Sequence, residues 1–162
     1  MIGEMQEAYL ADAALAATAL VLLYAAYVDL ARYQISNEII LLLGALFVVH
    51  VVLSGRWSEL PRNTGIALLV FLVLLYFYAR NWLGGGDVKL LTVGFLWAGV
   101  ECALPFAVLL SLFAFVHVLA GKIGWVKLTK SEDDARSRMA FAPAVAASLI
   151  SLFVLGCLAP VR

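Results

Sequence analysis

Long apolar runs recur along the chain and restrict its fold more than any other feature. A helix needs about 20 mostly apolar residues to cross the hydrocarbon core of a bilayer. Runs of this character, some of them shorter, occupy residues 9–28, 38–53, 65–78, 88–100, 105–120 and 140–158. We therefore expect an all-α, polytopic membrane protein with about six transmembrane helices.

Composition supports a membrane location for the whole chain. Apolar residues make up 65% of the 162 residues and charged residues 14%, whereas soluble domains average about 45–50% and 25%. A small soluble domain cannot bury so much apolar surface, so the surplus must face lipid. The net charge is zero, which excludes a general basic field for nucleic acid. The sequence predicts one membrane-embedded domain over residues 1–162, with the lipid bilayer as a partner.

The distribution of Lys and Arg predicts the orientation. With six spans, the connections 29–38, 79–89 and 121–139 share one side and contain eight Lys or Arg residues, against three on the other side. Basic residues collect on the cytoplasmic side of short loops. We therefore expect these three connections in the cytoplasm and both termini outside, as in an inner (cytoplasmic) membrane protein. The 121–139 connection contains the only long polar stretch, for which we expect a solvated loop.

Two aspartates lie where apolar runs begin or end. Asp29 directly follows the first run, and Asp87 follows three glycines and opens the fourth. Glycines disfavour a helix and permit unusual backbone angles. Non-helical backbone at this depth is tolerated where it lines a cavity or is covered by protein. We expect residues 84–87 to form a loop lining a cavity, with both aspartates at the cytoplasmic ends of helices.

Two carboxylates facing one cavity can share a proton, because like charges in contact do not easily both ionise. One can then act as a base on water while the other polarises a carbonyl, which is the chemistry of an aspartic protease. Spacing alone leaves a structural alternative equally open, in which Asp29 caps a helix or pairs with Arg32 and Asp87 caps the fourth helix. A further alternative is a transport or proton-conducting subunit that uses the same aspartates.

The remaining reactive side chains carry weaker signals. Cys102 and Cys157 are isolated in apolar stretches, so we expect buried thiols rather than a disulfide or a zinc site. We interpret His117 as a packed or hydrogen-bonded histidine near the cytoplasmic end of the fifth span, and His50 as an interfacial residue. No H-E-x-x-H motif is present, so the sequence predicts no metal site and no cofactor.

Three segments resemble one protease family. Residues 84–90 read Gly-Gly-Gly-Asp-Val-Lys-Leu and resemble the G-x-G-D-x-K-L signature of the type IV prepilin peptidases. Residues 29–37 resemble that family's other element, in which an aspartate ends a membrane helix and Ile-Pro-Asn follows, although Ser36 stands where the family often has proline. Residues 141–147 resemble the proline-containing start of the family's last helix.

The resemblance implies an aspartic endopeptidase that cuts the short basic leader from prepilins, its substrate partners, at the cytoplasmic face. The chain has neither the methyltransferase region nor the paired C-x-x-C motifs of larger members, so it is similar to the short, peptidase-only type of Flp or tight-adherence pilus systems. Archaeal preflagellin peptidases share the same aspartate pair. By position, the family's roles fall on Asp29 and Asp87 as the catalytic pair, on Gly84 and Gly86 as shapers of the loop, and on Lys89 and Asn37 as supporting residues.

Overall fold

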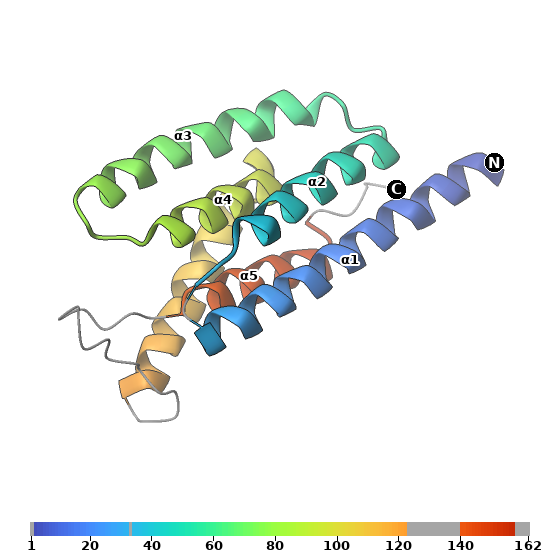
Figure 1. The fold of residues 1–162 in the computed structure, drawn as a ribbon. Helices are drawn as coiled ribbons and strands as arrows, with labels where there is room; N and C mark the ends of the chain where they lie inside the picture. Colours follow the sequence, from blue (N-terminus) through green and yellow to red (C-terminus); the bar gives the residue numbers. More distant parts are fainter. Residues whose placement is uncertain (1, 33, 123–139, 158–162) are drawn as a thin grey trace.

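The computed structural model describes residues 2–32, 34–122 and 140–157, and most of the 121–139 connection lies outside this part. The described residues form helices and no strand (Figure 1). The helices are α1 (Ile2–Arg32), α2 (Asn37–Ser54), α3 (Glu59–Ala79), α4 (Gly85–Lys122) and α5 (Ala142–Val154).

Four of these helices are long and apolar enough to cross a membrane. They are the 9–32 part of α1 together with α2, α3 and α4, whereas α5 is apolar but shorter. Many large apolar side chains are exposed, among them Leu68, Leu69 and Leu72 of α3, as expected for surfaces that face lipid. The all-α, multi-pass class is therefore confirmed, while the count of six spans and the placement of the termini stay predictions.

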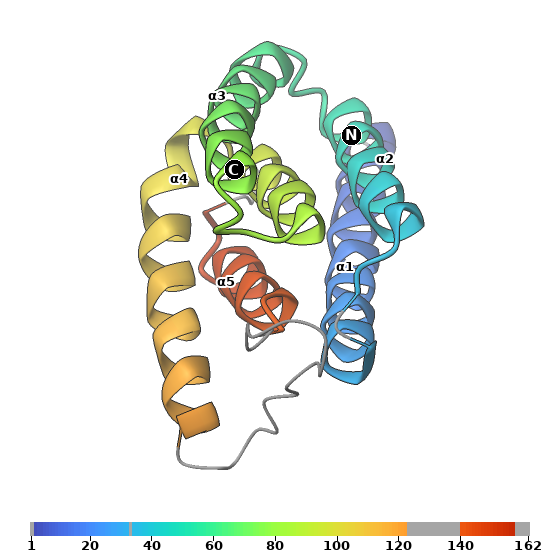
Figure 2. The ribbon, with the colours of Figure 1, turned by 60° about the vertical axis from the view of Figure 1, so that its left-hand side comes forward.

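The α4 element reverses its direction at Gly99. In an uninterrupted helix, Phe95 and Phe106 would be about 16 Å apart along the axis at 1.5 Å per residue. Their ring centroids are instead 4.9 Å apart. Gly99 has φ 64° and ψ −175°, so the helical path breaks there and the two arms fold back against each other (Figure 2). The expected segments 88–100 and 105–120 are the two arms of α4, and Pro105 lies within the second arm rather than at its start.

The core forms where α2, α4 and α5 meet. Trp97 of α4 is fully buried, and its indole Nε1 donates a hydrogen bond of 3.0 Å to the Leu43 carbonyl of α2. Its ring also packs on Phe47 of α2 and Phe153 of α5. A buried tryptophan needs a partner for its N–H, so this hydrogen bond fixes the orientation of the indole in the core.

His50 belongs to the same core, and its place at the membrane interface stays a prediction. Its side chain is 6% exposed, and its ring centroid lies 5.5 Å from that of Trp97. Nδ1 lies 3.3 Å from the Ala11 carbonyl oxygen of α1. The imidazole is buried because the backbone of α1 supplies the polar partner that a buried ring requires.

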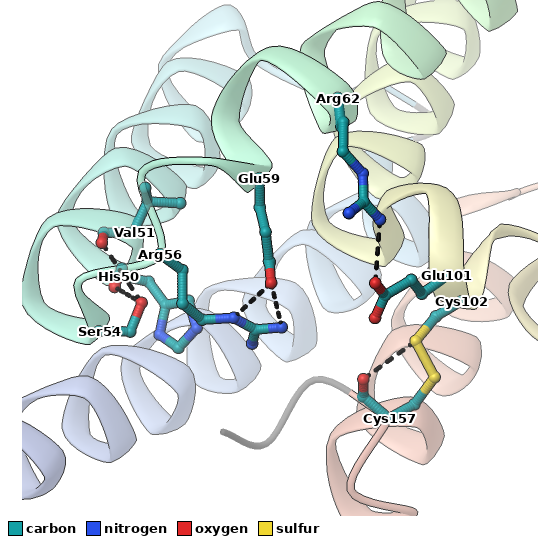
Figure 3. A network of polar contacts seen from close by, with 9 residues as sticks. All are labelled: His50, Val51, Ser54, Arg56, Glu59, Arg62, Glu101, Cys102 and Cys157. Carbon is teal, nitrogen blue, oxygen red and sulfur yellow. Dashed lines mark hydrogen bonds and ion pairs between the residues drawn. A yellow bond between two sulfur atoms is a disulfide. The ribbon is translucent and has the colours of Figure 1, made fainter. Parts of the chain in front are cut away.

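The two cysteines form a disulfide, which contradicts the expectation of buried thiols. Cys102 lies just after the reversal at Gly99, and Cys157 follows the end of α5. The positions are separated by 55 residues, so their proximity depends on the reversal of α4 and on the packing of α5. Figure 3 shows the bond next to an ion pair between α3 and α4.

Candidate active site

Asp29 is the last member of the stripe with which α1 faces the protein interior. Buried positions recur at intervals of three or four residues, the spacing of one helix face. The stripe comprises Ala11, Ala14, Thr18, Leu22, Ala25 and Asp29. Because it continues the stripe, the Asp29 side chain points into the protein rather than into lipid, and it is only 4% exposed.

The Asp29 carboxylate caps α5. The backbone N–H of Ala142 donates a hydrogen bond of 2.8 Å to Asp29 Oδ2. The first N–H groups of a helix lack intrahelical partners, and Pro143 has no N–H, so Ala142 is the donor that needs an external acceptor. The positive end of the helix dipole also favours a carboxylate here. The structural alternative, in which Asp29 caps a helix, agrees with this contact, but the sequence did not identify α5 as the capped helix; Pro143, typical of a helix start, was the available signal.

Asp87 lies in the first turn of α4, and its carboxylate folds back toward Gly84. The Gly84 backbone N–H is within hydrogen-bonding reach of that carboxylate, as in a capping box. A Cβ atom on residue 84 would lie 3.0 Å from Asp87 Oδ2, tighter than most real contacts. Glycine at position 84 therefore leaves room for the Asp87 carboxylate.

The expected loop over residues 84–87 is wrong, because α4 begins at Gly85. None of the three glycines has a positive φ. The Val88 N–H bonds to the Gly84 carbonyl at 3.1 Å, so the turn is helical from its start. A Cβ on Gly86 would touch Ile35 at 3.7 Å. Of the three glycines, only Gly84 has a tight contact at its Cβ position, and none adopts an unusual backbone conformation.

The start of α4 packs against the connection between α1 and α2. Lys89 Nζ donates a hydrogen bond of 2.8 Å to Oδ1 of Asn37, which is the first residue of α2. Asp87 lies within electrostatic range of Asp29, and Asp29 within range of the half-buried His117 on the second arm of α4. All six residues selected from the sequence thus gather at one end of the helices. Their roles stay predictions.

A groove lies between α1 and α2, on a different face of α1 from Asp29. Its volume is about 310 Å³. One part of its wall is apolar or aromatic, and its rim carries a hydroxyl, a guanidinium and a carboxylate. The lining residues are Tyr24, Tyr27, Val28, Ala31, Arg32, Ser36, Glu38 and Ile39.

A comparison with known protein families shows to which family the chain belongs. The model of the type IV leader peptidase family matches residues 16–120. The chain belongs to this family. The match contains both Asp29 and Asp87 and extends from α1 into the second arm of α4, whereas residues 141–147 lie beyond it. Neither the curated proteins nor the solved structures give a match. Membership makes the chain a peptidase, and its helices make it a multi-pass membrane protein.

Proposed function

We propose that the protein is an aspartic endopeptidase that removes the N-terminal leader of prepilin-like proteins at the cytoplasmic face of the membrane. Asp29 and Asp87 are the catalytic pair. The observation that carries the proposal is the inward-facing, nearly buried Asp29 carboxylate, which meets the first turn of α5 at the same end of the helices as Asp87.

The pair shares one proton, because two carboxylates in electrostatic contact do not both ionise readily. The unprotonated carboxylate takes a proton from water, and the water oxygen attacks the scissile carbonyl. The protonated carboxyl donates a hydrogen bond to the carbonyl oxygen as negative charge develops there. Transfer of a proton to the leaving amine then breaks the C–N bond. Backbone N–H groups at the start of α5, that of Ala142 among them, hold the Asp29 carboxylate in place for this reaction.

The groove between α1 and α2 supports a substrate that combines a hydrophobic helix with a polar leader. Val28 and Ile39 offer an apolar wall to the helix, and Glu38 at the rim offers a negative charge to a basic leader. The basic residues of the 29–38 and 79–89 connections favour the cytoplasm for this end.

The test is a processing assay in membranes with a co-expressed prepilin. Asp29→Asn and Asp87→Asn keep the size of each side chain but remove its acid-base capacity, so each is expected to abolish leader removal at normal expression. Asp12→Asn is the matched control, since Asp12 is an exposed carboxylate on the same α1 helix. Normal processing by either active-site variant would contradict the proposal. A proton leak in vesicles that requires both aspartates, without any cleavage, would favour the conducting alternative.

A further inference from the structure

The disulfide joins the far ends of the two elements that meet at the candidate site. The first arm of α4 begins beside Asp87 and ends at Gly99, shortly before Cys102. The α5 helix begins on Asp29 and ends shortly before Cys157. With 13 residues at 1.5 Å each, α5 is about 20 Å long. The disulfide therefore lies at the opposite end of these helices from the aspartates.

The end with the disulfide is also rich in exposed charge. Arg62 and Glu101, from α3 and α4, form an ion pair of 2.9 Å, and both side chains are more than half exposed. Arg56 and Glu59 form a second, partly buried pair of 2.7 Å nearby (Figure 3). An exposed ion pair such as Arg62–Glu101 belongs at a water-facing surface rather than in the hydrocarbon core. The two sulfur atoms are therefore near an aqueous compartment.

The redox chemistry of a disulfide indicates on which side of the membrane the two cysteines lie. Cytoplasmic thiol systems keep protein cysteines reduced, whereas disulfides form and persist in extracytoplasmic compartments. Formation of the Cys102–Cys157 bond removes two protons and two electrons from the two thiols. A thiol oxidase whose own disulfide becomes a dithiol accepts both electrons. A cytoplasmic catalytic end and an extracytoplasmic disulfide are compatible, because they occupy opposite ends of the helices.

We propose that Cys102 and Cys157 are the modification site of an extracytoplasmic thiol oxidase, and that the resulting disulfide positions α5 on Asp29. The disulfide restrains α5, the shortest helix in the described part of the chain, at its C-terminal end. At its other end the first turn of α5 supplies the N–H that holds Oδ2 of Asp29. The proposal rests on the orientation and the catalytic pair given under the proposed function.

The first experiment measures the oxidation state in cells. The chain has only these two cysteines, so alkylation with a maleimide-polyethylene glycol after acid trapping counts free thiols directly on a gel. We expect no added label in cells with an active extracytoplasmic thiol oxidase, and two labels per chain in cells without it. Two labels in the oxidase-containing cells would overturn the proposal, and continued cleavage in those cells would show that only the disulfide inference had failed.

The second experiment measures positioning in the purified protein with a prepilin substrate. Reduction with dithiothreitol is expected to lower kcat roughly tenfold with little change in KM, because a small displacement of a catalytic group is costly. Reoxidation should restore kcat. The double variant Cys102→Ala/Cys157→Ala should have the kcat of the reduced enzyme and no response to dithiothreitol. An unchanged kcat after full reduction would refute the positioning role, whereas inactivity of the fully oxidised protein would refute the proposed function instead.

Discussion

Substitution of Gly99 by alanine tests the reversal of α4, on which the position of α5 and of the candidate site depends. Gly99 combines φ 64° with ψ −175°, a region of backbone conformation that is essentially restricted to glycine. A Cβ atom there would also lie 2.7 Å from both Nδ2 and Oδ1 of Asn63, a residue that is itself 6% exposed. Gly99→Ala therefore introduces backbone strain and a steric clash together.

The two effects have separable magnitudes. A residue forced into such a backbone conformation costs about 1–3 kcal/mol, and overpacking of a filled site costs about 1–3 kcal/mol more. We expect Gly99→Ala to lower the free energy of unfolding by about 2–6 kcal/mol in total. The double variant Gly99→Ala/Asn63→Ala loses the clash but keeps the strain. It should therefore be more stable than the sum of the two single effects predicts, by about 1 kcal/mol or more.

Unfolding in detergent micelles, followed by circular dichroism, provides the assay. Gly65→Ala is the matched control, because Gly65 lies in the helical part of α3 with nothing within 4 Å of the added Cβ. Alanine is favoured over glycine in a helix by about 1 kcal/mol, so this control should be neutral or stabilising. If Gly99→Ala were as stable as Gly65→Ala, α4 would not reverse at Gly99 and the described fold would be wrong.

Two further predictions concern the start of α4. Gly84→Ala should reduce kcat about tenfold or more, because the added Cβ displaces the Asp87 carboxylate. Gly85→Ala is the control, since its added Cβ meets no atom closer than 3.5 Å. It should retain clearly more activity than Gly84→Ala in the same cleavage assay. Equal activity of the two variants would contradict the contact between Gly84 and Asp87. Lys89→Gln and Asn37→Ala each break the same hydrogen bond. The double variant should therefore lose no more kcat/KM than the more impaired single variant. Multiplicative losses in the double variant would show that the bond does not couple the two residues.

The class of fold could be predicted from the sequence because lipid leaves few options to an apolar chain. The apolar runs gave the helices, since every backbone polar group within a bilayer must be satisfied internally. A break between residues 100 and 105 was expected; these residues are helical, and the reversal lies just before them, at Gly99. The burial of Asp29 could also have been read from its register with Leu22 and Ala25 on the inner face of α1.

Features that depend on tertiary contacts could not be predicted. The pairing of Cys102 with Cys157 requires the reversal at Gly99. No local sequence pattern tells in which direction the second arm of α4 runs after Gly99. Burial of His50 requires the Ala11 carbonyl of α1 as its partner. The helical start at Gly85 was missed because glycine propensity opposes it, while capping by the Asp87 side chain and close packing favour it.

The central claim is that Asp29 and Asp87 act as one catalytic unit, and the residual rates of single and double variants test it most directly. When two groups act as one catalytic unit, removal of either group already removes the rate acceleration of the pair, so the effects of the two substitutions are strongly non-additive. The measurement is single-turnover cleavage of a prepilin by purified wild-type, Asp29→Asn, Asp87→Asn and Asp29→Asn/Asp87→Asn proteins in vesicles. The double variant is expected to be no slower than either single variant, with all three close to the uncatalysed rate. Substantial activity in one single variant, or a double-variant rate equal to the product of two independent losses, would contradict the dyad.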